Sequence, residues 1–187
     1  QLGGASDGPG AGEPSPGDLE SAALADRILS GEVHGDELEA LWQKLRDEKR
    51  IDGVLAEIER QAALSPNNPD LQTELGKAYI QKLFDVGIGP MASVWGEKAD
   101  KAFDQALALE ETHWEARFQK AISLSSAPSF LGLQGEAVRH FEILMEQQEH
   151  ASASPEHAMT YYFLGNMYDQ AGDHDKAVGI WKRGLQR

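Results

Sequence analysis

Histidine and carboxylate side chains are the groups in this sequence that could hold a metal ion or exchange protons. Six histidines are present, and none has the His-Glu-x-x-His spacing that places two imidazoles on one helix face. The nearest approach to a metal constellation is Glu149-His150 followed by Glu156-His157. Two solvated histidines near a helix end explain that pattern more simply than a coordinated ion does. We therefore expect no metal site.

Motifs of nucleotide binding and hydrolysis are also missing. The chain has no cysteine, which excludes disulfides, thiolate metal sites and cysteine nucleophiles. The stretch 87–90, Gly-Ile-Gly-Pro, is glycine-rich, but no lysine follows it, so we interpret it as a turn rather than a phosphate-binding loop. Carboxylates are too numerous for one pair to stand out as acid and base. The sequence predicts no enzyme activity, no catalytic residue and no cofactor.

Charge excludes a further class of function. The formal net charge of the 187 residues is −14, which opposes the phosphate contacts and counterion release that drive nucleic-acid binding. We therefore expect no nucleic-acid partner. No apolar run approaches the roughly 20 residues of a membrane span, so we expect no direct membrane insertion. The acidic residues either coat a helical protein or favour a basic partner.

Large and small residues alternate in the last segment as they do in a helical hairpin. Small residues stand where two helix backbones approach closely, and a glycine marks the turn between the helices. The members of this pattern are Tyr161, Leu164, Gly165, Tyr168, Gly172, Asp173, Ala177, Trp181 and Gly184. The pattern resembles the tetratricopeptide repeat (TPR).

Three earlier copies follow the same pattern. One combines Leu75, Gly76 and Tyr79 with Ala99, Phe103 and Ala106, and the next combines Ala121 and Leu124 with Ala137, Phe141 and Leu144. A degenerate first copy contains Leu38, Leu41, Leu45, Val54, Ile58 and Ala62, and departs from the family at Trp42, where a small residue is usual. The resemblance implies an all-α, right-handed superhelical solenoid of about four TPR-like hairpins.

We expect three regions along the chain. Residues 1–17 are rich in glycine and proline and predict a flexible tether. Residues 18–31 predict an extra N-terminal capping helix, and residues 32–187 predict the repeat domain. The chain begins with Gln1, which we interpret as the start of a fragment of a longer protein. A location outside a bacterial membrane, anchored upstream, is slightly favoured over the cytoplasm.

Two hairpins carry insertions between their helices. Tyr168 and Ala177 are nine positions apart in the last copy, whereas Tyr79 and Ala99 are twenty apart in the second. The third copy has a smaller excess, at 125–133. We therefore expect inserted loops in the second and third hairpins, at the same corner of adjacent repeats.

The insertions are apolar, and their side chains must pack on something. Leaving the seven large apolar side chains of 83–96 in water would forgo about 10 kcal/mol. Either the two insertions form a closed lid on each other and on nearby helices, or part of them forms an exposed patch for a partner. The patch would consist of Phe84, Ile88, Met91, Trp95, Phe130 and Leu131.

The first helices of TPR hairpins usually line a concave groove that binds peptides, and the resemblance implies such a groove here. Carried over by register, its lining includes Gln43, Lys77, Gln81, Phe118, Ile122, Tyr162 and Asn166. Only Lys77 offers a good cation, so we do not expect the clamp for a C-terminal carboxylate that the family is known for. Phe118 and Ile122 could equally be core between repeats.

The sequence thus predicts a scaffold that binds a protein or peptide partner through the groove, the apolar insertions or both. One alternative is a homo-oligomerisation module, because no polar helix covers the last apolar helix and a second copy could do so. Another is an accessory subunit with a small-ligand pocket under the larger insertion. The identity of the partner is not encoded in any pattern described above.

Overall fold

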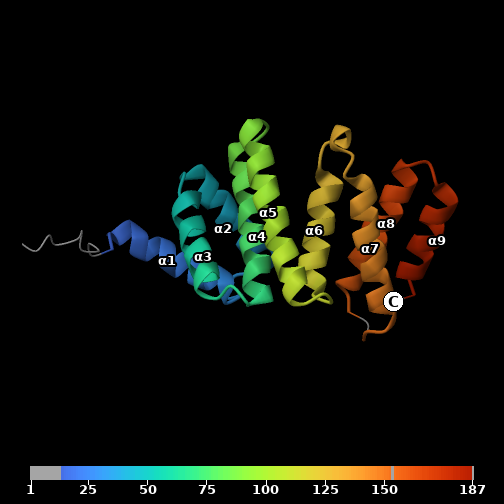
Figure 1. The fold of residues 1–187 in the computed structure, drawn as a ribbon, viewed down its shortest axis with the longest axis horizontal. Coiled ribbons are helices and arrows are strands. Elements are labelled where there is room, and N and C mark those ends of the chain that lie inside the picture. The colour runs from blue at the N-terminus through green and yellow to red at the C-terminus, as the bar shows by residue number, and fades with distance from the viewer. Residues whose placement is uncertain (1–13, 153, 187) are drawn as a thin grey trace, which may run out of the picture. The chain divides into compact units, whose positions relative to one another are not determined.

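The structure is a computed structural model that describes residues 14–152 and 154–186, and in these ranges it is helical, without strands (Figure 1). The expectation of an all-α fold is therefore confirmed. Two compact units divide within one helix, between Glu57 and Ile58. The elements in chain order are α1 (Pro16–Leu29), α2 (Gly35–Asp47), α3 (Ile51–Leu64), α4 (Pro69–Val86), α5 (Pro90–Leu109), α6 (Trp114–Ser126), the 3-10 helix η1 (Ser129–Leu131), α7 (Gln134–Glu149), α8 (His157–Gln170) and α9 (His174–Gly184).

The first unit contains α1, α2 and the beginning of α3. A capping box starts α1: the Ser15 hydroxyl accepts from the Asp18 amide at 3.2 Å, and the Asp18 carboxylate accepts from the Ser15 amide at 2.9 Å. Both contacts satisfy amides that the first helical turn leaves without a partner. The predicted tether, residues 1–17, lies mostly outside the described residues.

Trp42 lies in the core of the first unit. Its side chain is buried on α2, so the residue that departs from the repeat pattern supplies core volume. Gly53 of α3 faces Ser21 of α1 so closely that an added Cβ would meet the serine hydroxyl. The remaining buried apolar residues of this unit are Ala25, Ile28, Val33, Leu45, Ile51, Val54 and Leu55.

The second unit contains the end of α3 and three helical hairpins. The hairpins pair α4 with α5, α6 with α7 and α8 with α9, while α5 and α4 pack on α6 and α7 packs on α8. These three hairpins match the second, third and fourth predicted repeats. Phe103, Phe141, Tyr161 and Leu164 are buried along this stack.

Glycine allows the helices of two hairpins to approach closely. A Cβ added at Gly76 of α4 would clash with the ring of Phe103 of α5, and one added at Gly165 of α8 would clash with the indole of Trp181 of α9. Each large ring therefore fills the space that the absent side chain leaves. The small-against-large pattern in the sequence corresponds to this contact.

The larger insertion is mostly helical rather than a loop. α4 has 18 residues and α5 has 20, whereas α8 and α9 of the last hairpin have 14 and 11. Gly87–Gly89 alone connect α4 to α5, and Gly87 takes a φ of 64°, which favours glycine. The inserted residues therefore lengthen two paired helices, because their backbone groups are satisfied within the helices. The smaller insertion forms a loop that contains η1.

We expect Gly165→Ala to destabilise the protein by about 1–3 kcal/mol, because the new methyl group must displace the Trp181 ring. Urea unfolding followed by circular dichroism measures the change. Gly179→Ala is the matched control in the same hairpin, since nothing lies within 4 Å of its Cβ position. We expect the control to stabilise the protein by about 0.5–1 kcal/mol, as alanine does in a helix interior. Equal effects of the two changes would contradict the close packing.

Candidate functional site

A polar clasp holds the end of α3 to the second hairpin. The Tyr79 hydroxyl of α4 donates to the Glu59 carboxylate of α3 at 2.8 Å, and the Lys98 ammonium of α5 lies 3.3 Å from the same carboxylate. Lys98 also lies 5.0 Å from the centre of the Tyr79 ring and 4.4 Å from that of Trp95. Burial and then the Glu59 carboxylate raise the pKa of Tyr79, so the phenol keeps its proton and its hydrogen bond.

The same clasp recurs between the third and fourth hairpins. Tyr168 of α8 donates to Glu142 of α7, and Lys176 of α9 donates to the Tyr168 hydroxyl at 2.6 Å, with its ammonium 3.9 Å from the ring centre. Glu142 directly follows Phe141 as Glu59 directly follows Ile58, and each lysine directly precedes the small Ala99 or Ala177. The repeat pattern therefore extends to polar residues that the sequence analysis did not use.

The junction between the second and third hairpins, where α5 meets α6 and α7, is held by different residues. Leu124 replaces the tyrosine and Glu136 replaces the lysine, so neither clasp partner is present. Lys120 of α6 supplies the cation instead. Its side chain is 5% exposed, and its ammonium lies 2.5 Å from Asp104, 3.4 Å from Asp100 and 3.5 Å from Glu136.

Charges around Lys120 determine its protonation state and that of its neighbour His140. Burial alone lowers the pKa of Lys120, but Asp104, Asp100 and Glu136 together raise it above its usual value. Burial and then the charge of Lys120 lower the pKa of His140, which is therefore neutral at pH 7. The junction is thus a lysine enclosed by carboxylates, and it positions α5, α6 and α7 without offering an empty site.

Lys77, the cation predicted for the groove, is already paired with carboxylates of the protein. Lys77 of α4 lies 2.8 Å from Glu74 and 3.7 Å from Glu115 of α6. Burial alone lowers the pKa of Lys77, but these two carboxylates raise it overall. The lysine is therefore held by the protein's own acids, which disfavours a clamp for a carboxylate ligand.

Phe118 and Ile122, two further predicted groove residues, pack into the core. Both are partly buried against the cluster that contains Phe141 and Leu164. The Phe118 ring stacks on Trp114 at 4.7 Å and meets Phe163 edge-on at 6.1 Å. These contacts agree with the alternative that Phe118 and Ile122 are core residues between repeats. The Phe118 ring contacts Phe141 of α7 and Phe163 of α8.

The other predicted groove residues differ in exposure. Tyr162 of α8 is exposed, with its ring edge-on to Phe163 at 5.3 Å, whereas Asn166 and Gln81 are half-buried. Gln43 lies on α2 in the first unit, where it donates to Asp47 at 2.9 Å. The structure thus leaves Tyr162 as the large exposed apolar side chain among the predicted groove residues of the second unit.

The hairpin tips of the second unit, defined here as residues 84–94 and 128–133, expose large apolar side chains. Ile88 is fully exposed and Phe130 is 85% exposed. In Figure 1, the Gly87–Gly89 turn and η1 lie at the same edge of this unit. The other exposed apolar side chains of the tips are Phe84, Met91, Val94 and Leu131.

Trp95 differs from the rest of the predicted patch. It is half-buried and lies beneath the Lys98 ammonium, as part of the first clasp. Its ring centre is 5.8 Å from that of Tyr79. Five of the six predicted residues are thus exposed at the tips, whereas Trp95 packs against Tyr79 and Lys98.

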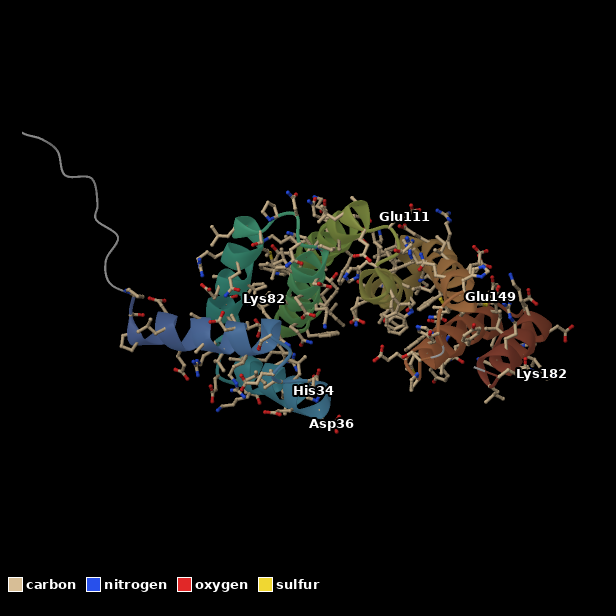
Figure 2. All side chains as sticks on the ribbon, turned by 90° about the horizontal axis from the view of Figure 1, so that it is seen from below. His34, Asp36, Lys82, Glu111, Glu149 and Lys182 are labelled. Atoms are coloured by element: carbon tan, nitrogen blue, oxygen red, sulfur yellow. The ribbon has the colours of Figure 1, made fainter. Side chains whose placement is uncertain are left out.

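Charge is sparse at both tips although 26% of the chain is charged: Asp85, paired with Lys82, is the single charged residue within them. No charged residue lies between Asp85 and Glu97, nor between Lys120 and Glu136. Figure 2 shows the opposite edge and labels Glu111, which follows α5, and Glu149, which ends α7 and pairs with Arg183. Charged side chains are thus present at that edge, whereas the tip edge is largely apolar.

Within the part of the chain that the structure describes, no cluster of three or more potential metal ligands is present. Glu149 of the histidine-containing segment lies close to Arg183 and forms an ion pair with it. Among the described helices, none is long and apolar enough to cross a membrane.

Comparisons with known proteins identify the architecture. No protein-family model matches the sequence, and no curated protein matches it. Among solved structures, TTC0263, a thermophilic TPR protein of Thermus thermophilus, matches 90% of this chain and 82% of its own with a TM-score of 0.60 and 15% identity. The chain has a tetratricopeptide-repeat fold. MamA of MSR-1 matches 91% of each chain with a TM-score of 0.53 and 18% identity, and MamA of AMB-1 covers 91% of this chain and 86% of its own with the same TM-score and identity.

We expect Lys120→Met to destabilise the protein by about 2–3 kcal/mol at pH 7, because it leaves three carboxylates together without their cation. The carboxylates are partly exposed, so water screens some of their repulsion. Burial already raises the pKa of Asp100, and the loss of the Lys120 charge removes an influence that lowers it. The penalty is therefore largest above the usual carboxyl pKa and shrinks as the pH falls through it.

Urea unfolding at pH 7 and at pH 3.5 measures this penalty. Lys101→Met is the matched control, since Lys101 is exposed and pairs only along its own helix with Glu97 at 2.7 Å. We expect this control to leave the free energy of unfolding nearly unchanged at both pH values. A Lys120→Met penalty that stays constant between the two pH values would contradict the electrostatic account.

Proposed function

We propose that this protein is a non-catalytic scaffold that binds a protein partner through the apolar hairpin tips. The supporting observation is that large apolar side chains project at one edge from two adjacent hairpins, and that Asp85, paired with Lys82, is the single charged residue of the two tips. A contiguous exposed apolar surface is costly in water, and in folded proteins it commonly marks an interface. The paired helices α4 and α5 hold their tip out from the stack, so a partner can reach it.

The face of the first helices is the less favoured surface. Lys77 is engaged by two carboxylates, and Phe118 and Ile122 pack on the core, so little of the predicted groove remains to bind a ligand. Binding there would require breaking these contacts before new ones form. The tips require no such change, because their side chains are already in water.

A pull-down from cells of the source organism, read by mass spectrometry, tests the proposal. Ile88→Asp combined with Phe130→Asp places charges on both tips, and we expect it to reduce the recovery of a specific partner at least about tenfold, since buried charge without a partner is strongly unfavourable. Both side chains are exposed, so the fold is expected to remain intact.

Tyr162→Ala is the matched control for the pull-down. It removes an exposed aromatic side chain from the first-helix face. We expect this variant to recover the partner as the unchanged protein does. Loss of the partner with Tyr162→Ala and retention with the tip variant would move the binding site to the groove.

A homodimer through α9 is the second candidate. Val178 is 42% exposed on this helix and Leu185 is 88% exposed just after it, so a second copy could cover them. Light scattering over a wide concentration range tests this assembly. A constant monomer mass excludes it, and a dimer that Leu185→Asp dissociates supports it.

A further inference from the structure

A furrow of about 480 Å³ lies along the second unit between α3, α4 and α5. Its floor is formed by small and apolar side chains, and its rim is polar. The lining residues that carry the argument are Glu59, Ala62, Gln72, Lys98, Lys101 and Ala102. This volume is within the range of sites that hold a peptide side chain or a small ligand.

The furrow is open because three equivalent positions of the repeat are smaller here than at the next two junctions. Ala62 corresponds to Leu107 and Met145. Ala102 corresponds to His140 and Ile180, and Gln72 corresponds to Arg117 and Tyr161. These correspondences follow from aligning Ile58, Phe103, Phe141 and Trp181 on the second helices, and Gly76, Ala121 and Gly165 on the first helices.

The larger equivalents are packed where they occur. Arg117 is 5% exposed and donates to the Glu111 carbonyl at 2.6 Å, and Ile180 and Tyr161 belong to the buried cluster. The junctions that follow are thus filled by side chains from the chain itself. At the first junction Ala62, Gln72 and Ala102 are buried as well, but they are smaller than their equivalents and they line the furrow.

Two lysines and one carboxylate are the charged residues that line the furrow: Lys98 and Lys101 on α5, and Glu59 on α3. Glu97, which pairs with Lys101, is not among the lining residues. The chain as a whole has a net charge of −14, so a lining with more lysines than carboxylates is unusual for it. The lysines are 43% and 73% exposed, and their pairs with Glu59 and Glu97 are partly or fully at the surface. Such pairs are weak and can be exchanged for an incoming carboxylate.

We infer that this furrow binds an acidic peptide segment of a protein partner. An aliphatic or aromatic side chain of the segment would fill the floor beside Ala62 and Ala102, and neighbouring carboxylates would pair with Lys98 and Lys101. The furrow is a docking site additional to the hairpin tips and does not rest on them. A charged anchor beside an apolar one gives the furrow a selectivity that the largely apolar tips lack.

Selection of displayed random peptides on the purified full-length protein tests this inference. We expect enriched sequences that combine acidic residues with one large apolar residue. Synthetic fluorescent copies of the enriched peptides are then titrated by anisotropy against three variants. The unchanged protein provides the reference dissociation constant.

Ala102→Ile places in the furrow the residue that the fourth hairpin has at the equivalent position. We expect it to weaken peptide binding at least about tenfold by filling the floor, with the fold checked by circular dichroism and the thermal midpoint. Lys101→Glu reverses a surface charge without touching the core, and we expect it to weaken binding roughly fivefold. Ile88→Asp alters a tip, and we expect it to leave the peptide affinity unchanged.

Three outcomes would overturn the inference. They are enrichment of no peptide, enrichment of peptides without acidic residues, and unchanged affinity in both Ala102→Ile and Lys101→Glu. Loss of affinity with Ile88→Asp alone would place the peptide on the tips instead. The pull-down tests the tips with Ile88→Asp and Phe130→Asp, whereas the titration tests the furrow with Ala102→Ile and Lys101→Glu. A negative result in one experiment therefore does not decide the other.

Discussion

Close approach of paired helices is the constraint on which the second unit depends. Gly76 lies against the Phe103 ring and Gly165 against the Trp181 ring, with no room for a methyl group at either contact. An interior packed this densely allows one relative position of the two helices. That position aims the ends of α4–α5 and α6–α7 toward the same edge of the unit (Figure 1).

Polar contacts then join one hairpin to the next. The tyrosine–glutamate–lysine clasp around Tyr79 has a counterpart around Tyr168, and Lys120 with its carboxylates serves the junction between them. These contacts engage lysines and carboxylates at each junction. The proposed partner surfaces are the apolar tips and the furrow, and the lining of the furrow includes the clasp residues Glu59 and Lys98.

The fold could be predicted from the sequence because its signal is repeated. Glycine or alanine opposite a large ring recurs at Gly76, Ala121 and Gly165, and one copy supports the interpretation of another. The apolar tip residues could be predicted because the extra spacing in two hairpins is filled with large apolar side chains. The groove residues could not be assigned in this way: Phe118 has the same spacing whether it faces a ligand or Phe163, and only the contacts distinguish the two. The furrow was missed because Ala102 fits the pattern of small residues, and its meaning depends on comparison with His140 and Ile180.

Oxidation of the four methionines by dilute hydrogen peroxide, resolved by mass spectrometry, tests the exposure of the tips most directly. Met91 at the tip is 51% exposed and Met159 is 44% exposed, whereas Met145 and Met167 pack against the core. Because thioether oxidation follows access, we predict fast reaction at Met91 and Met159 and slow reaction at the other two. A rate at Met91 as slow as that at Met145 would contradict the account, since the tip would then be covered in the isolated protein.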